Sequence, residues 1–141
     1  YVKARYDGEI LYSDALLAEF VSALKRRGLW ENTILIVCAD HGEEFYEHGD
    51  WDHARDLFPE KLRVPLLIKL PAQQHAGARV NGLASAVDLV PTLLPLLGLT
   101  PDPALPGVNL LDSPCEGIAR EQHFAEHWEP CYTERDGRTV T

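Results

Sequence analysis

The spacing of apolar residues predicts a helix at the start of the chain. Between about Asp7 and Arg27 the apolar positions recur three and four residues apart, which is the pattern of an amphipathic helix. Lys25 and Arg26 suit the negative end of a helix dipole, and Gly28 readily adopts the left-handed conformation that follows many helices. We therefore expect the helix to end just before Gly28.

Two short apolar runs, residues 33–39 and 64–70, predict strands. Both are apolar at successive positions, and the first is rich in β-branched residues. Runs of this kind suit strands that are buried on both faces of a parallel sheet. Pro65 lies near the start of the second run, where a strand tolerates proline. The polar segment between the runs, Glu43 to Arg63, is interpreted as a connection.

A second helix is predicted over residues 89–97. Ser85 and Asp88 have the spacing of a capping box, the residues that follow are almost all apolar, and Gly98 marks the end. Pro95 removes one backbone hydrogen bond, so we expect it to kink or shorten this helix. We interpret Asp88 as a helix cap rather than as a metal ligand.

The order of these segments, with a helix, a strand, a loop, a strand and a helix, is typical of the α/β class. Proline and glycine make residues 100–109 a loop, and residues 122–127 form one more candidate strand. No apolar run approaches the roughly 20 residues that a membrane-spanning helix needs. The sequence thus predicts no membrane span.

Composition and charge narrow the classes of partner. The chain has 141 residues, of which 45% are hydrophobic, as in one globular domain or part of one. Lys and Arg number 13 against 22 Asp and Glu, and the formal net charge of −9 argues against a nucleic-acid partner. A small anionic substrate stays compatible, because a metal ion or a few local cations can reverse the field inside one cleft.

The start of the chain and its cysteines concern two questions, whether the chain is part of a larger protein and which redox compartment it occupies. The first residues include neither an initiator Met nor a signal peptide, and we expect the chain to be part of a larger protein. Cys38, Cys115 and Cys131 have no metal-like spacing and leave the redox compartment undecided.

Asp40 and His41 are the first candidates for chemistry, because they follow a predicted strand at its carboxyl end. That is the side of an open α/β sheet on which ligands bind. A carboxylate and an imidazole brought together by a turn at Gly42 suit Zn, Mn or Fe and do not exclude Ca or Mg. The alternative is a capping Asp and a surface His in a tight turn.

Two more histidines, His48 and His53, lie in the same connection among several carboxylates. This clustering favours a metal site or an acid–base site. The carboxylates of the connection include Glu43, Glu44, Glu47, Asp50 and Asp52. For Glu44, Glu47 and Asp50 we favour the simpler interpretation that they belong to a solvated acidic loop.

Two cations close the connection, and their roles stay open at this point. Arg63 can pair with Glu60 or another acid, as a structural ion pair or as a contact to substrate. Lys61 has the same two interpretations. Asp14, on the polar side of the first predicted helix, is interpreted as solvated.

Several short motifs follow one another between Tyr6 and about Leu111. They are Tyr6-Asp7-Gly8-Glu9-Ile10 with Asp14, Gly28-Leu29-Trp30-Glu31-Asn32-Thr33-Ile34, Ala39-Asp40-His41-Gly42-Glu43 with Glu47-His48-Gly49 and His53, Arg63-Val64-Pro65-Leu66, and Asp88-Leu89-Val90-Pro91-Thr92-Leu93-Leu94 followed by Gly98. In this order and spacing they make a chain that resembles the sulfatase family of the alkaline phosphatase superfamily.

The resemblance implies an α/β fold with a mostly parallel sheet flanked by helices, of which this chain is a partial domain. Residues 1–111 would be the later, C-terminal portion of a sulfatase-like catalytic domain, and residues 112–141 the start of the following segment. We expect the separate chain to self-associate or to bind a partner, because an incomplete sheet leaves apolar residues exposed at its edge.

The resemblance also implies roles for three residues. Asp40 and His41 match the family's second pair of metal ligands, for a divalent ion that would be calcium or manganese. His53 lies near the Lys or His that contacts the ester oxygens and protonates the leaving group. His48 matches a recurrent His-Gly to which we assign no role. An Asp-His pair is similar to that of members that also hydrolyse phosphate or phosphonate esters.

A first strand that ends in paired acidic metal ligands, which the family carries, is missing from the chain. A second family motif is missing as well, a Cys or Ser followed by x-Pro-x-Arg, whose first residue becomes the formylglycine nucleophile. We expect this motif upstream, and therefore expect the whole protein to hydrolyse a small-molecule sulfate or phosphate ester while this chain alone is inactive. The alternatives are a phosphoesterase, phosphonate hydrolase or phosphoethanolamine transferase of the same superfamily, and a non-catalytic half-domain that binds a partner.

Overall fold

The computed structural model describes residues 1–53, 56–80 and 82–112. The predicted strand at residues 122–127 and nearly all of the segment 112–141 lie outside the described residues. The chain divides into two compact units, whose described parts run from Tyr1 to Gln74 and from His75 to Asp112. Each unit is described by itself.

The first unit begins with helix α1, Val2–Arg26, which starts earlier than the sequence pattern predicts. Gly8 is accommodated inside it, because one internal glycine costs only about 1 kcal/mol relative to alanine. The end is as predicted: Lys25 and Arg26 occupy the last turn, and Gly28 has a left-handed φ of 69°. Among the described parts of the chain, no residue of α1 is buried.

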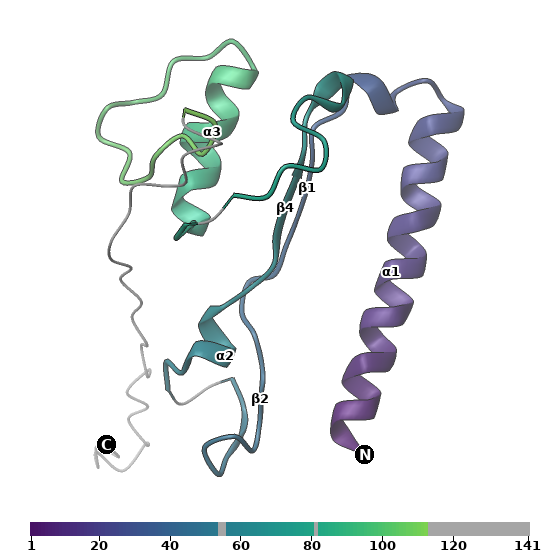
Figure 1. The fold of residues 1–141 in the computed structure, drawn as a ribbon, viewed down its shortest axis with the longest axis vertical. Coiled ribbons are helices and arrows are strands. Elements are labelled where there is room, and N and C mark those ends of the chain that lie inside the picture. The colour runs from purple at the N-terminus through teal and green to yellow at the C-terminus, as the bar shows by residue number, and fades with distance from the viewer. Residues whose placement is uncertain (54–55, 81, 113–141) are drawn as a thin grey trace, which may run out of the picture. The chain divides into compact units, whose positions relative to one another are not determined.

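Strands β1, Leu35–Cys38, and β4, Leu66–Lys69, confirm the two predicted strands and lie side by side in Figure 1. Their pairing is antiparallel, with Leu35 opposite Lys69 and Cys38 opposite Leu66. The expectation of parallel neighbours is therefore wrong for this pair. A parallel pair needs a crossover that returns along the sheet, whereas the chain between β1 and β4 stays at one end of the strands.

The two strands are also less buried than predicted in the part of the chain that is described. The side chain of Leu67 is 60% exposed, and Cys38 is exposed as well. Within the first unit, neighbouring segments leave part of both strands uncovered. The α/β class holds, with helices and two small antiparallel sheets in the described residues.

The connection between β1 and β4 contains three short elements that periodicity does not reveal. Strands β2, Glu44–Phe45, and β3, Trp51–Asp52, form an antiparallel hairpin. Helix α2, Pro59–Leu62, is a single turn that Pro59 starts without losing a helical hydrogen bond. Elements this short give no countable repeat of apolar positions, so their residues read only as a polar loop.

Lys69, the last residue of β4, binds the segment that follows α1. The short 3-10 helix η1, Trp30–Asn32, follows α1 there. The Lys69 Nζ atom donates to the backbone oxygen of Trp30 and, at 2.9 Å, to that of Thr33. It also lies 4.4 Å from the centre of the Trp30 ring, close enough for a cation–π contact. Neutral acceptors and an aromatic face thus hold this end.

The second unit contains the predicted capping box and helix. The 3-10 helix η3, Ala86–Asp88, leads into α3, Leu89–Leu96, and Ser85 and Asp88 cap each other's backbone as expected. Pro95 lies inside α3 near its end, and Gly98 follows with a left-handed φ of 74°. The predicted helix is therefore confirmed, with an early end.

Asp88 caps the helix and also holds the loop that follows it. One carboxylate oxygen accepts from the Ser85 backbone N–H at 2.7 Å, and the other accepts from Val108 at 2.9 Å. One turn later, the Thr92 hydroxyl accepts from the Leu110 backbone N–H at 2.9 Å. Asp88 and Thr92 are both buried. The proline-rich loop is thereby pinned at its far end.

Among the described residues, no helix combines the length and the apolar character needed to cross a bilayer.

Candidate functional site

Asp40 and His41 lie just past the end of β1, and their side chains face each other. Asp40 Oδ2 lies 3.8 Å from His41 Nε2, and Asp40 Oδ1 accepts from the His41 backbone N–H at 3.0 Å. The His41 Nδ1 atom is 2.8 Å from the Gly42 carbonyl oxygen, which can only accept, so Nδ1 carries a proton. This arrangement turns Nε2 toward the carboxylate. The pair predicted from sequence is therefore brought together.

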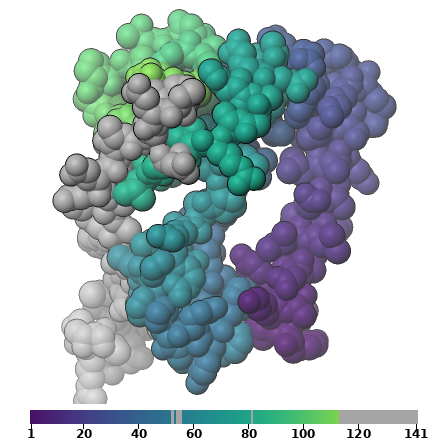
Figure 2. Space-filling view, in the orientation of Figure 1, coloured from purple at the N-terminus to yellow at the C-terminus, as the bar shows by residue number. Residues whose placement is uncertain are grey.

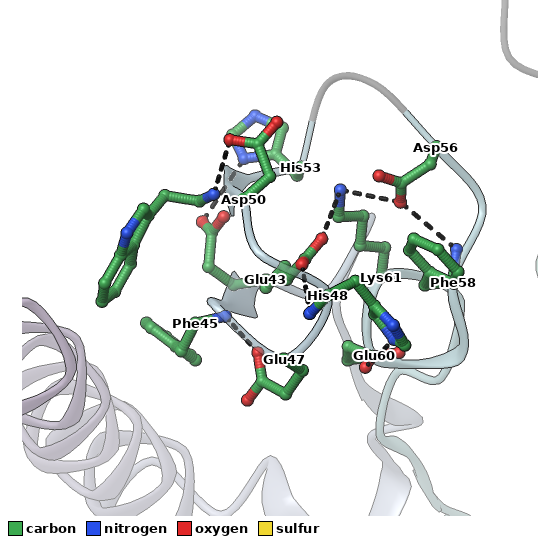
Figure 3. Close-up of polar contacts among 12 residues, drawn as sticks. Glu43, Phe45, Glu47, His48, Asp50, His53, Asp56, Phe58, Glu60 and Lys61 are labelled. Atoms are coloured by element: carbon green, nitrogen blue, oxygen red, sulfur yellow. Dashed lines mark hydrogen bonds and ion pairs between the residues drawn. The ribbon is translucent and has the colours of Figure 1, made fainter.

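His53 joins this pair from the other side of the hairpin. Its ring stacks on the His41 ring, with centroids 4.0 Å apart and planes 21° from parallel. Its Nδ1 atom lies 3.3 Å from Glu43 Oε2. Both histidine side chains are 45% exposed, so solvent and a ligand can reach them. The three residues predicted for the site thus form one exposed cluster, which Figure 3 shows in part with Glu43 beside His53.

The β2–β3 hairpin is the reason that His53 returns to His41. The pairing places Glu44 opposite Asp52, so the residues just outside the pair, 43 and 53, also meet. The turn between the strands is tight: Tyr46 has a φ of 77°, which is unusual for a residue with a side chain, and Gly49 has a φ of 92°. The hairpin therefore sets the distance between His53 and the end of β1.

Glu44 corrects one prediction from the sequence. The sequence predicts that it faces water in an acidic loop, but its side chain is fully buried, with 0% exposure. Burial is possible because the ammonium of Lys61, itself 5% exposed, lies 3.1 Å from Glu44 Oε2. The same ammonium contacts Asp56 at 2.8 Å (Figure 3). Glu44, Lys61 and Asp56 are called the lysine triad below.

The charges of the triad shift one another's pKa. Burial alone would raise the pKa of Glu44, but the His48 backbone N–H and the Lys61 ammonium hold that pKa below its ordinary value. The hydrogen bond from Lys61 lowers the pKa of Asp56, and the same bond raises the pKa of Lys61. All three groups are therefore charged at neutral pH.

His48 has a packing role that its sequence context did not reveal. Its ring stacks on Phe58 with centroids 3.6 Å apart, and its Nε2 atom lies 2.8 Å from Glu60 Oε1. Its backbone N–H donates to Glu44 at 2.9 Å. Glu60, considered above as a partner for Arg63, is thus engaged by His48. These contacts join the hairpin to α2.

Helix α2 also packs directly on the turn that carries the predicted ligands. The Gly42 backbone N–H donates to the Lys61 carbonyl at 2.7 Å. A Cβ atom at Gly42 would collide with the carbonyl oxygen of Glu60. Figure 2 shows the segments 40–53 and 56–62 in direct contact at this end of the strands. The absence of a side chain at Gly42 therefore permits the close approach of α2.

The donor set fits two ligands of a divalent cation. Oδ2 of Asp40 and Nε2 of His41 are near enough to share one ion, and a backbone carbonyl on Nδ1 is the usual support for a metal-binding imidazole. A divalent ion takes four or more ligands. Within residues 1–53, 56–80 and 82–112 no group of three or more His, Cys, Asp and Glu side chains could hold one. The described residues would thus supply part of a coordination sphere.

The chain is thus an α/β fragment in which an exposed Asp-His pair and a second His meet at the carboxyl end of β1. The profile of the Sulfatase family matches residues 2–99, and the chain belongs to the sulfatase family. The family lies in the alkaline phosphatase superfamily, as the order of sequence motifs predicts.

Individual relatives agree with this assignment. The chain is 36% identical over 87% of its length to arylsulfatase K of Bos taurus, of which it covers 22%. It is 32% identical over 91% of its length to a multifunctional alkaline phosphatase superfamily protein of Trinickia caryophylli, of which it covers 25%. It spans about a quarter of the length of these curated relatives.

A solved structure resembles the fold over most of the chain. The protein in that structure was solved in complex with its own substrate, D-glucosamine-2-N,6-O-disulfate. The TM-score is 0.75 at 28% sequence identity, and the match covers 85% of this chain and 25% of that one. The fold is therefore that of part of a sulfatase domain.

Proposed function

We propose that the protein containing this chain is a metal-dependent sulfuric ester hydrolase and that this chain supplies part of its active site. One observation carries the proposal within the family: Asp40, His41 and His53 form a single exposed cluster at the end of β1. Two relatives, an arylsulfatase and an N-acetylglucosamine-6-O-sulfatase, support a sulfate ester as the substrate.

Asp40 and His41 would hold the divalent metal, for which calcium or manganese is proposed, through Oδ2 and Nε2. When bound, the cation would offset charge on the ester oxygens and lower the pKa of the nucleophile. The contribution of this chain is to orient the two ligands. The Gly42 carbonyl fixes the His41 tautomer, and the His41 backbone N–H fixes the Asp40 carboxylate.

His53 would contact the ester oxygens and give a proton to the leaving group. Glu43 Oε2, which lies 3.3 Å from Nδ1, is placed to accept the Nδ1 proton and to orient the ring, so that Nε2 would be the atom that gives a proton to the leaving group. A protonated imidazole in an exposed cluster can reach a bound ester. Glu43 thus supports His53 in the way that the carboxylate of a catalytic triad supports its histidine.

The nucleophile is proposed to lie in another part of the protein. None of the 141 residues of this chain is a Cys or Ser followed by x-Pro-x-Arg. Formylglycine, which the family uses generally, would therefore come from outside the chain, and the chain alone would be inactive.

Substitution of a metal ligand tests the proposal in the whole protein. We expect Asp40→Ala to lose bound metal and turnover together, by at least about 100-fold in kcat, because metal activation contributes several kcal/mol. Asp14→Ala, which removes an exposed carboxylate from α1, is the matched control and should change neither. Metal content is measured by plasma emission spectrometry. Full activity of Asp40→Ala with normal metal content would contradict the proposal.

A second candidate is hydrolysis of phosphate or phosphonate esters. The relative described as a multifunctional alkaline phosphatase superfamily protein supports it, together with the Asp-His ligand pair. The same preparation distinguishes the two when it is assayed on 4-nitrophenyl sulfate and 4-nitrophenyl phosphate. A larger kcat/KM on the phosphate would replace the sulfatase assignment.

A further inference from the structure

We propose that Lys61 is a positioning residue, which fixes where His53 lies relative to the Asp40-His41 pair. Its side chain binds the chain before and after His53, and its backbone binds the turn that follows His41. The inference rests on the proposed function, because it assigns a supporting role within the same site. Lys61 touches none of the three site residues through its side chain in the contacts described, and acts through their neighbours.

The first step is that the Lys61 ammonium holds the chain on both sides of His53. Before His53, Glu44 binds the ammonium and is paired across the hairpin with Asp52. After His53, Asp56 binds the same ammonium at 2.8 Å. His53 therefore lies between two anchors that share one cation, and its path is constrained at each end.

The second step is that the backbone of Lys61 holds the turn with the ligand pair. Its carbonyl oxygen accepts from Gly42, the residue directly after His41, and α2 fits there because Gly42 has no side chain. A single residue thus contacts the ligand turn through its backbone and the segment with His53 through its side chain. A change in one placement is transmitted to the other through this residue.

The third step is that two of the three charged groups of the triad are held in place because they are buried. Glu44 is fully buried and Lys61 is 5% exposed, whereas the Asp56 side chain is 29% exposed. Two charges removed from water keep a narrow geometry, since any displacement leaves one of them unpaired. An apolar side chain of the same volume would fill the space but would not impose this directional constraint.

The experiment compares Lys61→Met with Lys69→Met in the whole protein. Lys69 is the matched control, because it also bridges two segments of the first unit, and its contacts there are to Trp30 and Thr33. Lys61→Arg keeps the charge. Asp56→Asn removes the more exposed acceptor and should fold even if Lys61→Met does not. Each variant is studied at a temperature where it is fully folded.

The first readout needs no activity. Hydrogen exchange of the Gly42 and His48 backbone amides, which donate to Lys61 and Glu44, should speed up at least about 10-fold in Lys61→Met. Asp56→Asn should show a smaller change in the same direction. Lys69→Met should leave both amides unchanged, and Lys61→Arg should restore most of the protection.

The second readout is the dependence of kcat on the leaving group. General acid catalysis matters most for poor leaving groups. We expect Lys61→Met to lower kcat on an alkyl sulfate about 10-fold more than kcat on 4-nitrophenyl sulfate, with little change in KM. Lys69→Met should leave this ratio unchanged, and Lys61→Arg should recover it.

The inference is overturned if Lys61→Met and Asp56→Asn, while folded, leave both amide protection and the leaving-group ratio at wild-type values. It is also overturned if Lys69→Met changes the ratio equally, because the effect would then be general to stability. Normal turnover and metal content of Asp40→Ala would instead count against the proposed function, so the two failures are distinguishable.

Discussion

Two lysines hold the two ends of the β1–β4 strand pair, and they bind different acceptors. At the end near α1, Lys69 binds two backbone carbonyls and the face of Trp30. At the end near the candidate site, Lys61 binds the carboxylates of Glu44 and Asp56. At the end near α1 the lysine is thus held by neutral acceptors alone. The end that carries the site depends instead on paired charges, of which Glu44 and Lys61 are buried.

This difference has a physical consequence for each end. A carbonyl keeps its acceptor capacity at every pH and tolerates small displacements. A buried carboxylate is stable only while it is ionised and paired, and removal of its partner leaves an uncompensated charge. The site end is therefore expected to be the more sensitive to sequence change and to acid.

The largest expected effect on stability comes from a steric clash at the end that carries the candidate site. Gly42→Ala should lower the free energy of unfolding by about 1–3 kcal/mol or more, because the new Cβ atom collides with the backbone of Glu60, which has no flexible end to move away. Urea denaturation measures it. Gly8→Ala is the control: no heavy atom lies within 4 Å of its added Cβ, so it should stabilise α1 by about 0.5–1 kcal/mol. Equal stability of Gly42→Ala and wild type would show that α2 does not pack on Gly42.

The next expected effect is selective weakening of the site end in acid. The pKa values of Glu44 and Asp56 are lowered in the folded state, so their contribution to stability is complete above the ordinary carboxylate pKa of about 4 and is lost as pH falls through the lowered values. The raised pKa of Lys61 acts in the opposite range, where its contribution is lost only as pH rises through the raised value, above about 10.

Hydrogen exchange between pH 3 and pH 6, corrected for intrinsic rates, measures this effect at about 25 °C. Protection of the His48 amide, which donates to Glu44, should fall at the acid end, and that of the Thr33 amide, which donates to Trp30, should not. His48 Nε2 and Glu60 Oε1, which lie 2.8 Å apart, also face this region. Equal loss of protection at both amides would remove the distinction between the two ends.

The smallest expected effect concerns the other end. Lys69→Met should lower the free energy of unfolding by about 1–2 kcal/mol, because it removes two hydrogen bonds from a charged donor that is only partly buried. Its apolar chain still packs against Trp30. Thermal unfolding followed by Trp fluorescence measures the change, and a loss greater than that of Gly42→Ala would reverse the order of the two ends.

Local signals in the sequence account for what could be predicted. The end of α1 at Gly28, the capping box of Ser85 and Asp88, and strands β1 and β4 all depend on residues a few positions apart. The motif order led to the family and to the cluster of Asp40, His41 and His53, although their proposed roles stay predictions. In each case the informative residues lie close together along the chain or in a recurring order.

The remaining features depend on residues that are distant in sequence. The antiparallel pairing of β1 and β4 follows from the path of the connection, which no periodicity records. The prediction for Glu44 was wrong because its partner, Lys61, follows only after the hairpin and a turn. An acid in a polar loop is usually solvated, and only the tertiary contact distinguishes this one.

The pinning of the proline-rich loop by Asp88 and Thr92 has a consequence for how this part of the chain can diverge. Both anchors act on backbone amides, those of Val108 and Leu110, and thus do not depend on which side chains occupy the loop. The cost of closing a longer loop grows only slowly with its length. Residues 100–106 can therefore gain or lose residues over evolutionary time while η3, which leads into α3, keeps its capping box.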